Sequence, residues 1–198
     1  MNLQQQITLT IGQASITAPV QTVVAAILSE AQNENTLAAQ NHPRIGTFWQ
    51  EEGGVLLGIM RGEENLPDYF LIAPTDPLAS NELAYGGYGI KTPGADSQRD
   101  GMANTIALCR AETDHPAAQW ARSLTIAGHK DLYLPALREL ALGNANAPEL
   151  FAQRWHLSST QYSAYDAYVQ HFSDGLQTNN LKVNGHCVRA VRRKLIIQ

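Results

Sequence analysis

Two carboxylates in the segment GHKDLYLPALREL, Asp131 and Glu139, are close enough in sequence to support acid–base chemistry. Pro135 is expected to begin a helix, which places Glu139 on the first turns of that helix. A carboxylate there can also cap the helix or pair with a neighbouring cation. The sequence favours such a buried structural role over catalysis, for example pairing with Arg189 or Arg192 near the end of the chain.

Three more carboxylates, Asp76, Asp96 and Asp100, fall in the stretch 74–101, which is rich in Gly, Pro, Asp and Ser and is expected to be a long loop. Their oxygens could bind Ca²⁺, but stabilisation of the loop is the favoured interpretation, and no metal site is predicted. The run Gly86-Gly87-Tyr88-Gly89 lacks the Gly-x-Gly-x-x-Gly spacing of a nucleotide site. A loop that needs left-handed backbone angles explains these glycines.

Histidine and cysteine spacing also gives little support for catalysis. The six histidines contain no H-x-x-x-H pattern, Cys109 and Cys187 contain no C-x-x-C pattern, and no G-x-S-x-G elbow marks a nucleophile. We therefore expect two free thiols, no cofactor and no enzymatic activity.

The segment 161–186 combines tyrosines with small polar residues, a composition typical of recognition surfaces. Alternation along the expected strand 167–172 places Phe172 toward the core, so Val169 and His171 are expected to face outward. An ordinary sheet edge beside a tyrosine-rich core is the alternative. The predicted ligand-binding residues are Tyr162, Ser163, Tyr165, Asp166, Val169, His171, Ser173, Asp174, Leu176, Thr178 and Asn179.

Both helices and strands are needed to position this segment. Helical patterns cover the middle of the chain and strand patterns gather at its end, with a turn at Asp174-Gly175. The predicted fold is α+β, with a C-terminal antiparallel sheet packed on helices that contain 117–122 and 136–142. The expected strands are 55–60, 68–73, 155–159, 167–172, 176–183 and 188–193, and the expected helices are 102–112, 116–123 and one that begins at Pro135.

The N-terminal residues form a separate pattern. Strands are expected at 6–11 and 14–17, followed by a helix that begins at Pro19 and carries the apolar stripe Val20, Val24, Ile27 and Leu28. A polar linker is expected at 33–42. Residues 1–42 are therefore a candidate segment for oligomerisation or attachment, with docking onto the domain 43–198 as the alternative.

Composition limits the class of protein. The chain has 198 residues, 44% of them hydrophobic, and a net charge of −4 with a pI of about 5.8. This charge argues against binding to nucleic acid, and the basic residues near the C-terminus are expected to form a solvated strand face. No apolar run approaches the roughly 20 residues of a membrane helix, and no signal peptide is evident, so synthesis in the cytoplasm is expected.

Three texts in the last third of the chain, GHKDLYLPALREL, WHLSSTQYSAYDAYVQHFSDG and CVRAVRR, carry a family resemblance. Together they resemble the C-terminal domain family of the Legionella collagen-like protein, a branch of the C-type-lectin-like fold. The matching positions are Asp131, Leu134, Pro135, Glu139, Leu140, Ser158, Ser159, Thr160, Phe172, Gly175, Val188, Arg189, Val191 and Arg192.

The resemblance implies a receptor-binding protein of a phage or prophage tail, located in the virion. Its partners would be a host-surface protein or glycan and other tail proteins, and it would form a homo-oligomer, with a homotrimer expected. Some proteins with this ending are diversified by retroelements, which implies a variable segment between fixed flanking texts. The alternatives are an intracellular binding protein of the same fold and an enzyme of the formylglycine-generating type.

Overall fold

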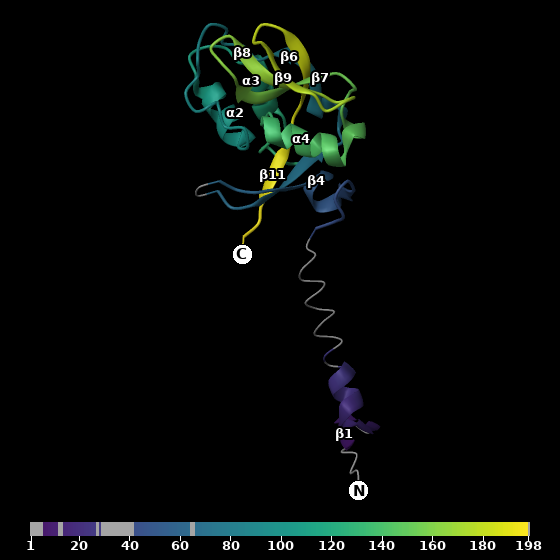
Figure 1. Ribbon diagram of the computed structural model, residues 1–198. Coiled ribbons are helices and arrows are strands. Elements are labelled where there is room, and N and C mark those ends of the chain that lie inside the picture. Colours follow the sequence, from purple (N-terminus) through teal and green to yellow (C-terminus); the bar gives the residue numbers. More distant parts are fainter. Residues whose placement is uncertain (1–5, 12–13, 27, 29–41, 64–65, 198) are drawn as a thin grey trace. The chain divides into compact units, whose positions relative to one another are not determined.

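The computed structural model of the protein describes residues 6–11, 14–26, 28, 42–63 and 66–197. The chain divides into two compact units, Met1–His42 and Pro43–Gln198 (Figure 1). The expected linker 33–42 lies, except for His42, outside the described residues. No helix in the described part of the chain is long and apolar enough to span a bilayer.

The first unit contains a β-hairpin followed by a helical segment. Strands β1 (Gln6–Ile11) and β2 (Ala14–Pro19) pair antiparallel, and residues 20–26 and 28 are helical. Pro19 was expected to begin the helix, but it is the last residue of β2, a strand end where its missing N–H is tolerated. Within this unit Val24 and Leu28 expose 45% and 56% of their surface. Ile27 lies outside the described residues.

The second unit contains two β-sheets. The first has the strand order β11-β5-β4-β3, and all its pairs are antiparallel. The predicted hairpin of two apolar strands is confirmed as β4 and β5. The bounds are β3 Phe48–Trp49, β4 Gly54–Met60, β5 Tyr69–Pro74 and β11 Arg192–Leu195, with the 3-10 helix η1, Gln50–Glu52, between β3 and β4.

The second sheet has the order β6-β10-β7-β8-β9. Strands β10 and β7 are parallel, whereas the other pairs are antiparallel, so the predicted antiparallel C-terminal sheet is confirmed for every pair except this one. The bounds are β6 Ser80–Ala84, β7 Trp155–Gln161, β8 Asp166–His171, β9 Gln177–Leu181 and β10 Gly185–Arg189.

Local signals explain where the helices begin. Asp100 caps α2 by accepting a hydrogen bond from the Ala103 N–H, and Pro116 is the first residue of α3. Helix α4 begins two residues after Pro135. The bounds are α2 Gly101–Arg110, α3 Pro116–Ser123 and α4 Leu137–Asn146, with 3-10 helices η2 Pro77–Ala79 and η3 Pro148–Leu150.

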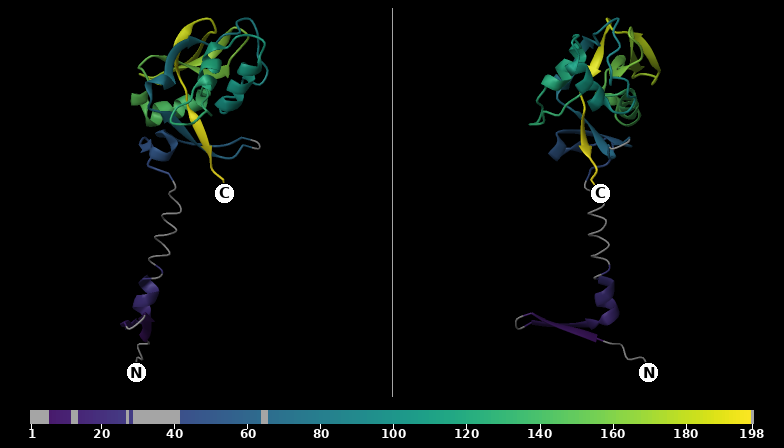
Figure 2. Two further views of the ribbon diagram at one scale, coloured as in Figure 1. Left: turned by 180° about the vertical axis from the view of Figure 1, so that it is seen from behind. Right: turned by 90° about the vertical axis from the view of Figure 1, so that its left-hand side faces the viewer.

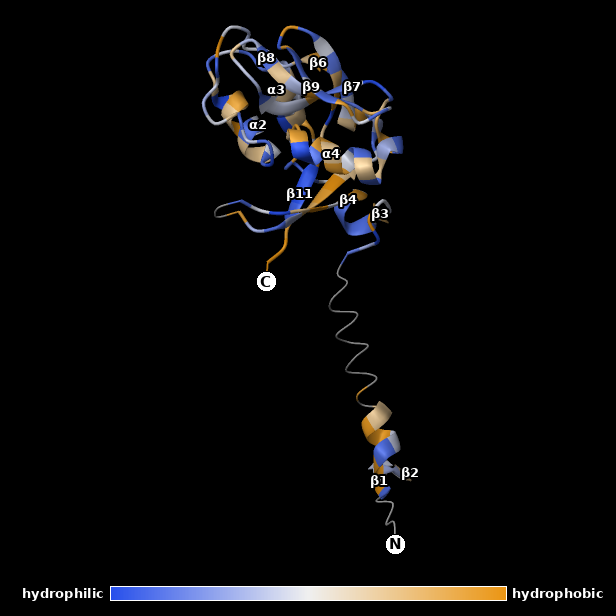
Figure 3. Cartoon of the chain, in the orientation of Figure 1, coloured by the Kyte–Doolittle hydropathy of each residue, from blue (hydrophilic) through white to orange (hydrophobic). Residues whose placement is uncertain are grey.

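The helices join the two sheets into one α+β unit (Figure 2). Helix α4 contacts β4 of the four-stranded sheet and β7 and β8 of the five-stranded sheet. Apolar residues of α2 and α3 form a hydrophobic core with the five-stranded sheet. Figure 3 shows the apolar residues of β4 close to α4, whereas most of β11 is hydrophilic. The expected packing of the C-terminal sheet on helices is therefore confirmed.

Two expected segments differ from the structure. The stretch 74–101 was expected to be a loop throughout, but it contains η2 and β6, and β6 pairs with β10. Its sequence SNELA has no apolar alternation because the strand lies at the edge of the sheet. Residues 188–193 were expected to form one strand, but the chain breaks after Arg189 and changes sheets. At the crossing the Ala190 N–H donates to the Ala79 carbonyl, and Val191 pairs with Tyr133.

Candidate ligand-binding surface

The structure places most of the predicted ligand-binding residues at the surface. Ser163, Asp166 and His171 are half-buried, and Val169 is buried. The exposed members are Tyr162, Tyr165, Ser173, Asp174, Leu176, Thr178 and Asn179.

Val169 is a correction. It was expected to face outward, but it is completely buried and packs in the core beside Leu157, its partner on β7. The expectation took its parity from Phe172, which lies one residue beyond the end of β8, where strict alternation no longer holds. Val169 is therefore part of the scaffold.

Most of the remaining residues form two groups at opposite ends of β8, and Thr178 and Asn179 lie between these groups on β9, opposite Val169 and Tyr168. Strand β8 has six residues and therefore separates its ends by roughly 17 Å. One group, 162–166, ends at the first residue of the strand, and the other, 171–176, begins at its last residue. The structure therefore divides the predicted site in two.

The first group lies in a loop that is ordered by its own side chains. The Ser163 hydroxyl accepts hydrogen bonds from the N–H groups of Tyr165 and Asp166, each at 3.0 Å. It also donates to the Asp166 carboxylate at 3.1 Å. Ser163 and Asp166 thus hold the loop, while Tyr162 and Tyr165 each remain 53% exposed.

Tyr88 joins this group from a loop that the sequence did not connect with it. Its ring contacts the Tyr165 ring edge-on, with centroids 5.3 Å apart, and Tyr162 contacts Tyr168 in the same way at 5.3 Å. The Gly89 N–H donates to the Ala164 carbonyl, which fastens the two loops together. We call Tyr88, Tyr162, Tyr165 and Tyr168 the tyrosine patch.

The glycines around Tyr88 meet the backbone requirement that the sequence predicted. Gly86, Gly87 and Gly89 have φ angles of 82°, 60° and 86°. These are left-handed conformations that side-chain-bearing residues rarely adopt. The only sequence signal for Tyr88 was an aromatic residue surrounded by such glycines.

A buried polar network holds the Tyr88 loop in place. The Gln161 side chain accepts from the Thr92 N–H at 3.0 Å and donates to the Thr92 carbonyl. The Lys182 ammonium donates to the Ile90 carbonyl at 2.8 Å and to Gln161 at 3.3 Å. His115 contacts the Thr92 hydroxyl at 3.2 Å. Since partners of this kind fix the loop backbone, the tyrosine patch is preorganised.

Burial changes the titration of this network. Desolvation lowers the pKa of Lys182, and the nearby Asp166 carboxylate partly opposes that change. Desolvation also lowers the pKa of His115, whose Nδ1 lies 3.0 Å from the Tyr85 carbonyl. Because the Tyr85 carbonyl can only accept, Nδ1 donates to it, and in the neutral ring Nε2 accepts from the Thr92 hydroxyl.

The tyrosine patch adjoins a groove of about 500 Å³. Ile90, Thr92 and Pro93 form one side of the groove, and the C-terminal part of α2 with residues 111–113 forms the other. Ile90 is 48% exposed. The groove therefore begins two residues after Tyr88 and has both apolar and polar walls.

The residues that carry the family resemblance are mostly buried. Ser158, Ser159 and Thr160 are fully buried on β7, and the Thr160 hydroxyl donates to the Ser97 carbonyl at 2.8 Å. It also accepts from the Leu137 N–H at 3.1 Å. The WHLSST text thus connects β7, the 92–100 loop and α4, which is a structural task.

Glu139 is also buried, as predicted, but its partners differ from the expected arginines. One carboxylate oxygen accepts from the Tyr69 and Tyr133 hydroxyls at 2.7 and 2.6 Å, and the other accepts from the Ala136 N–H at 2.7 Å. Desolvation raises the pKa of Glu139 to about 7. The expected pairing of Glu139 with Arg189 or Arg192 was wrong. Glu139 lies in the first turn of α4, where Tyr69 of β5 and Tyr133 are its partners instead.

The two arginines have other partners. Arg192 pairs with Glu52 and, at 3.1 Å, with Asp131, whose side chain is 43% exposed. Arg189 donates to the Pro74 carbonyl and to the Ser80 hydroxyl at 2.7 Å. Both side chains therefore tie the C-terminal strands to the body of the domain.

Two of the three candidate carboxylates in the 74–101 stretch have structural partners, and the third, Asp96, is exposed. Asp76 accepts from the Leu78 N–H at 2.8 Å, and Asp100 pairs with Arg193 at 2.8 Å as well as capping α2. Cys109 and Cys187 are free thiols, as predicted. Within the described ranges, no three His, Cys, Asp or Glu side chains are arranged to hold a metal ion.

The second predicted group surrounds the hairpin between β8 and β9. The Asp174 carboxylate accepts from the Leu176 N–H at 3.0 Å, and Gly175 has a φ of 76°, which confirms the predicted turn. His171 Nδ1 lies 2.7 Å from the Ser173 hydroxyl. This group is held by local contacts and is not part of the tyrosine patch.

No protein-family model matches this chain, and no curated protein is significantly similar to it. The geometry of the surface and the motif resemblance therefore carry the functional inference.

Proposed function

We propose that residues 43–198 form a C-type-lectin-like binding domain that recognises a host-surface protein or glycan through the tyrosine patch. The observation that carries this proposal is the exposure of Tyr88, Tyr162 and Tyr165, at 50%, 53% and 53%, on loops held by buried hydrogen bonds. Rigid exposed aromatic rings supply contact area at a low entropic cost on binding.

The fixed flanking texts are buried, whereas the segment between them is partly exposed, and this contrast supports the same proposal. Ser158, Ser159, Thr160 and Glu139 are fully buried, whereas the segment between the flanking texts exposes two tyrosines. A display protein needs this separation, because its binding residues must be able to change without loss of the core.

The proposed setting is the tail of a phage or prophage, where the chain would act as a homotrimer with other tail proteins. The motif resemblance supports the setting, and the exposed Val24 and Leu28 of the N-terminal unit support self-association. Burying such a side chain contributes roughly 1.5–3 kcal/mol. Sedimentation of the intact chain at micromolar concentration is expected to show a trimer, and a monomer at all concentrations would contradict this part of the proposal.

Binding to whole bacterial cells tests the function. The labelled wild-type chain is expected to bind the cells of a susceptible host, and Tyr165→Ala should weaken binding more than tenfold with a nearly unchanged melting temperature, since a central aromatic anchor contributes about 2 kcal/mol or more. Phe48→Ala is the matched control, because Phe48 is a 46% exposed aromatic residue on the other sheet. If Tyr165→Ala binds normally, the tyrosine patch is not the recognition surface.

A further inference from the structure

Strand β9 is an outer strand of the five-stranded sheet and lacks the usual protection of an exposed edge. In the described residues the second unit has four outer strands, β6 and β9 of one sheet and β3 and β11 of the other. Charged residues and prolines protect such edges against pairing with another chain. Strand β11 carries three basic residues, β6 carries Glu82, and β3 has only two residues. Strand β9, with the sequence QTNNL, has neither a charge nor a proline.

The hydrogen bonds between β8 and β9 determine which backbone groups of β9 point outward. The Lys182 N–H, one residue beyond β9, donates to the Tyr165 carbonyl at 2.9 Å. Because hydrogen-bonded pairs alternate along an antiparallel ladder, Gln177, Asn179 and Leu181 direct their backbone groups away from β8. For Gln177 and Asn179, no hydrogen bond to these N–H and carbonyl groups is found in the described part of the chain.

Leu181 closes one end of this free edge. Its N–H accepts a partner within the same strand, the Asn180 Oδ1 atom at 2.8 Å. Its carbonyl accepts a hydrogen bond from the Asn184 N–H at 3.0 Å. The outward backbone groups of Leu181 are therefore occupied.

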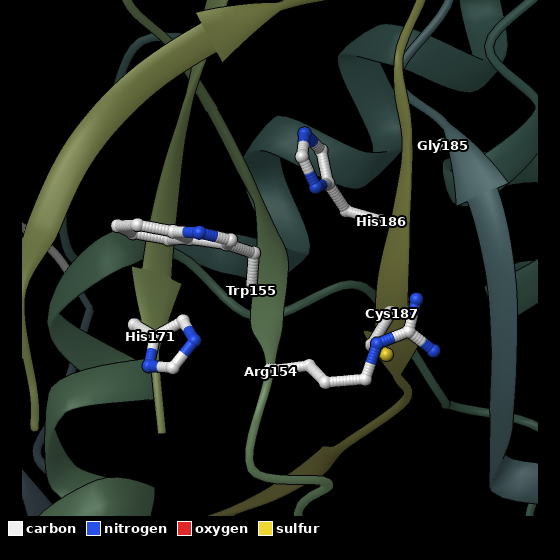
Figure 4. A pocket seen from close by; sticks show the side chains of 6 residues that line it. All are labelled: Arg154, Trp155, His171, Gly185, His186 and Cys187. Carbon is white, nitrogen blue, oxygen red and sulfur yellow. The ribbon is translucent and has the colours of Figure 1, made fainter. Parts of the chain in front are cut away.

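The hairpin between β8 and β9 closes the other end. The His171 N–H donates to the Leu176 carbonyl at 2.8 Å. The His171 ring lies beside Trp155 of β7, with centroids 4.9 Å apart (Figure 4). Residues 177–179 therefore form a short free edge with two N–H groups and two carbonyls that have no partner among the described residues.

Side chains on both faces of β9 surround this edge. Asn179 lies opposite Tyr168 of the tyrosine patch, and both Thr178 and Asn179 are exposed. Leu176 and Leu181, at the two ends of the edge, expose 56% and 42% of their surface. The free edge is therefore continuous with the tyrosine patch through Tyr168 and is flanked by apolar side chains.

An extended segment of another protein matches these features. A strand supplies N–H and carbonyl groups at the spacing of the edge, which a glycan does not. Antiparallel pairing of β9 with β9 of a second copy closes after two chains, so it does not build the proposed trimer. Because β9 has no charge, an uncharged segment is the complementary partner.

We propose that the free edge of β9 binds an extended, uncharged segment of a host-surface protein by strand addition. The segment pairs with the backbone of Gln177 and Asn179, and its alternate side chains contact Tyr168 and the two exposed leucines. Strand addition at this edge rests on the proposed function and assigns the partner of that surface to the proteins rather than the glycans.

Binding of the labelled chain to susceptible host cells tests the backbone contact. Asn179→Pro removes an outward N–H, so the ladder to β8 keeps its hydrogen bonds while an added strand loses one. We expect Asn179→Pro to weaken binding by about tenfold or more, and Asn179→Ala, the matched control that keeps the N–H, to bind within about twofold of the wild type. Wild-type binding by Asn179→Pro would overturn strand addition. An equal loss in Asn179→Ala would also overturn it, because the side chain would then be the contact.

Tyr165→Ala distinguishes failure of this site from failure of the proposed function. Loss of binding in Tyr165→Ala but not in Asn179→Pro would leave the tyrosine patch in place and remove strand addition. Thr178→Lys is the second variant if Asn179→Pro does not fold. It keeps the backbone and adds a charge of the kind that protects edge strands, so it should also weaken binding. Normal binding by a folded Thr178→Lys chain would contradict strand addition.

Treatment of the cells separates the classes of partner. Proteinase K should abolish binding, and periodate, which oxidises sugars, should not. Loss of binding after periodate but not after proteinase K would assign a glycan and overturn the proposal. Sedimentation of Asn179→Pro should match that of the wild type, and a smaller assembly would show that β9 pairs with a second copy instead.

Discussion

Tyrosines in two regions of this protein have opposite roles. Tyr69 and Tyr133 are fully buried beside α4 and donate their hydroxyls to Glu139, whereas Tyr162 and Tyr165 expose half of their surface at the end of the five-stranded sheet. The difference lies in the partner of the hydroxyl. A buried phenol requires a protein acceptor, and an exposed one keeps its hydrogen-bonding capacity for water or a ligand. The comparison teaches that residue type alone did not identify the binding surface.

The largest expected effect is on Glu139, which the two buried tyrosines share. Glu139→Ala should lower the free energy of unfolding by roughly 3–5 kcal/mol, because it leaves both hydroxyls and the Ala136 N–H without their acceptor. Urea denaturation measures the loss. Cell binding per folded molecule should not change, and a loss of binding in the folded fraction would break the separation between scaffold and surface.

The titration of Glu139 gives the next largest effect. Its pKa is raised from an ordinary 4.5 to about 7 in the folded protein, so the folded state holds the proton more tightly than the unfolded state. The raised pKa therefore stabilises the folded state fully below pH 4.5, and this stabilisation is lost as the pH rises to about 7. The loss in the free energy of unfolding is on the order of 3 kcal/mol. The Tyr69 hydroxyl is compatible with both the protonated and the ionised form of Glu139, because it also lies 2.8 Å from the Arg99 carbonyl, which can accept its proton.

Comparison with Glu139→Gln isolates this titration. Burial lowers the pKa of His156 to about 4, which makes stability rise with pH over an overlapping range. The wild-type profile contains both effects together with those of other titrating groups, and the Gln variant lacks only that of Glu139. The unfolding free energy of the wild type minus that of the Gln variant should fall steadily from pH 4.5 to 7. A difference that does not depend on pH would contradict the assignment.

Removal of single hydroxyl groups should give the smallest effects and the sharpest comparison. Tyr133→Phe is expected to lower the free energy of unfolding by about 1–2 kcal/mol, as loss of a hydrogen bond to a buried acceptor does. Tyr165→Phe should change it by less than about 0.5 kcal/mol, because the residue is exposed. Thermal denaturation of the two variants side by side measures both, and equal losses would remove the distinction between the two regions.

Local sequence signals predicted many elements of the fold. The apolar runs of β4 and β5, the proline that begins α3 and the Asp174-Gly175 turn each depend on neighbouring residues, and each was found where expected. Strand β6 was missed, since its polar sequence has no alternation and its pairing with β10 joins distant parts of the chain. For the same reason the break after Arg189 was missed.

The candidate surface was predicted only in part. Tyr162 and Tyr165 were identified from composition, but Tyr88 is distant in sequence and reaches them through a loop that Lys182 and Gln161 hold. Val169 was assigned to the wrong face because its parity was taken from a residue beyond the strand. The position of β9 at the edge of its sheet carried no sequence signal, because the order of the strands depends on pairing between distant segments.

The sequence by itself determined the α+β class, the free thiols, the start of α3 and the turn, because spacing, capping and backbone preference act over a few residues. Tertiary structure decided which tyrosines face solvent, which carboxylate pairs with which arginine, and which side chains meet at the patch. Those outcomes depend on burial and on contacts between strands far apart in the chain, and local sequence carries little information about either.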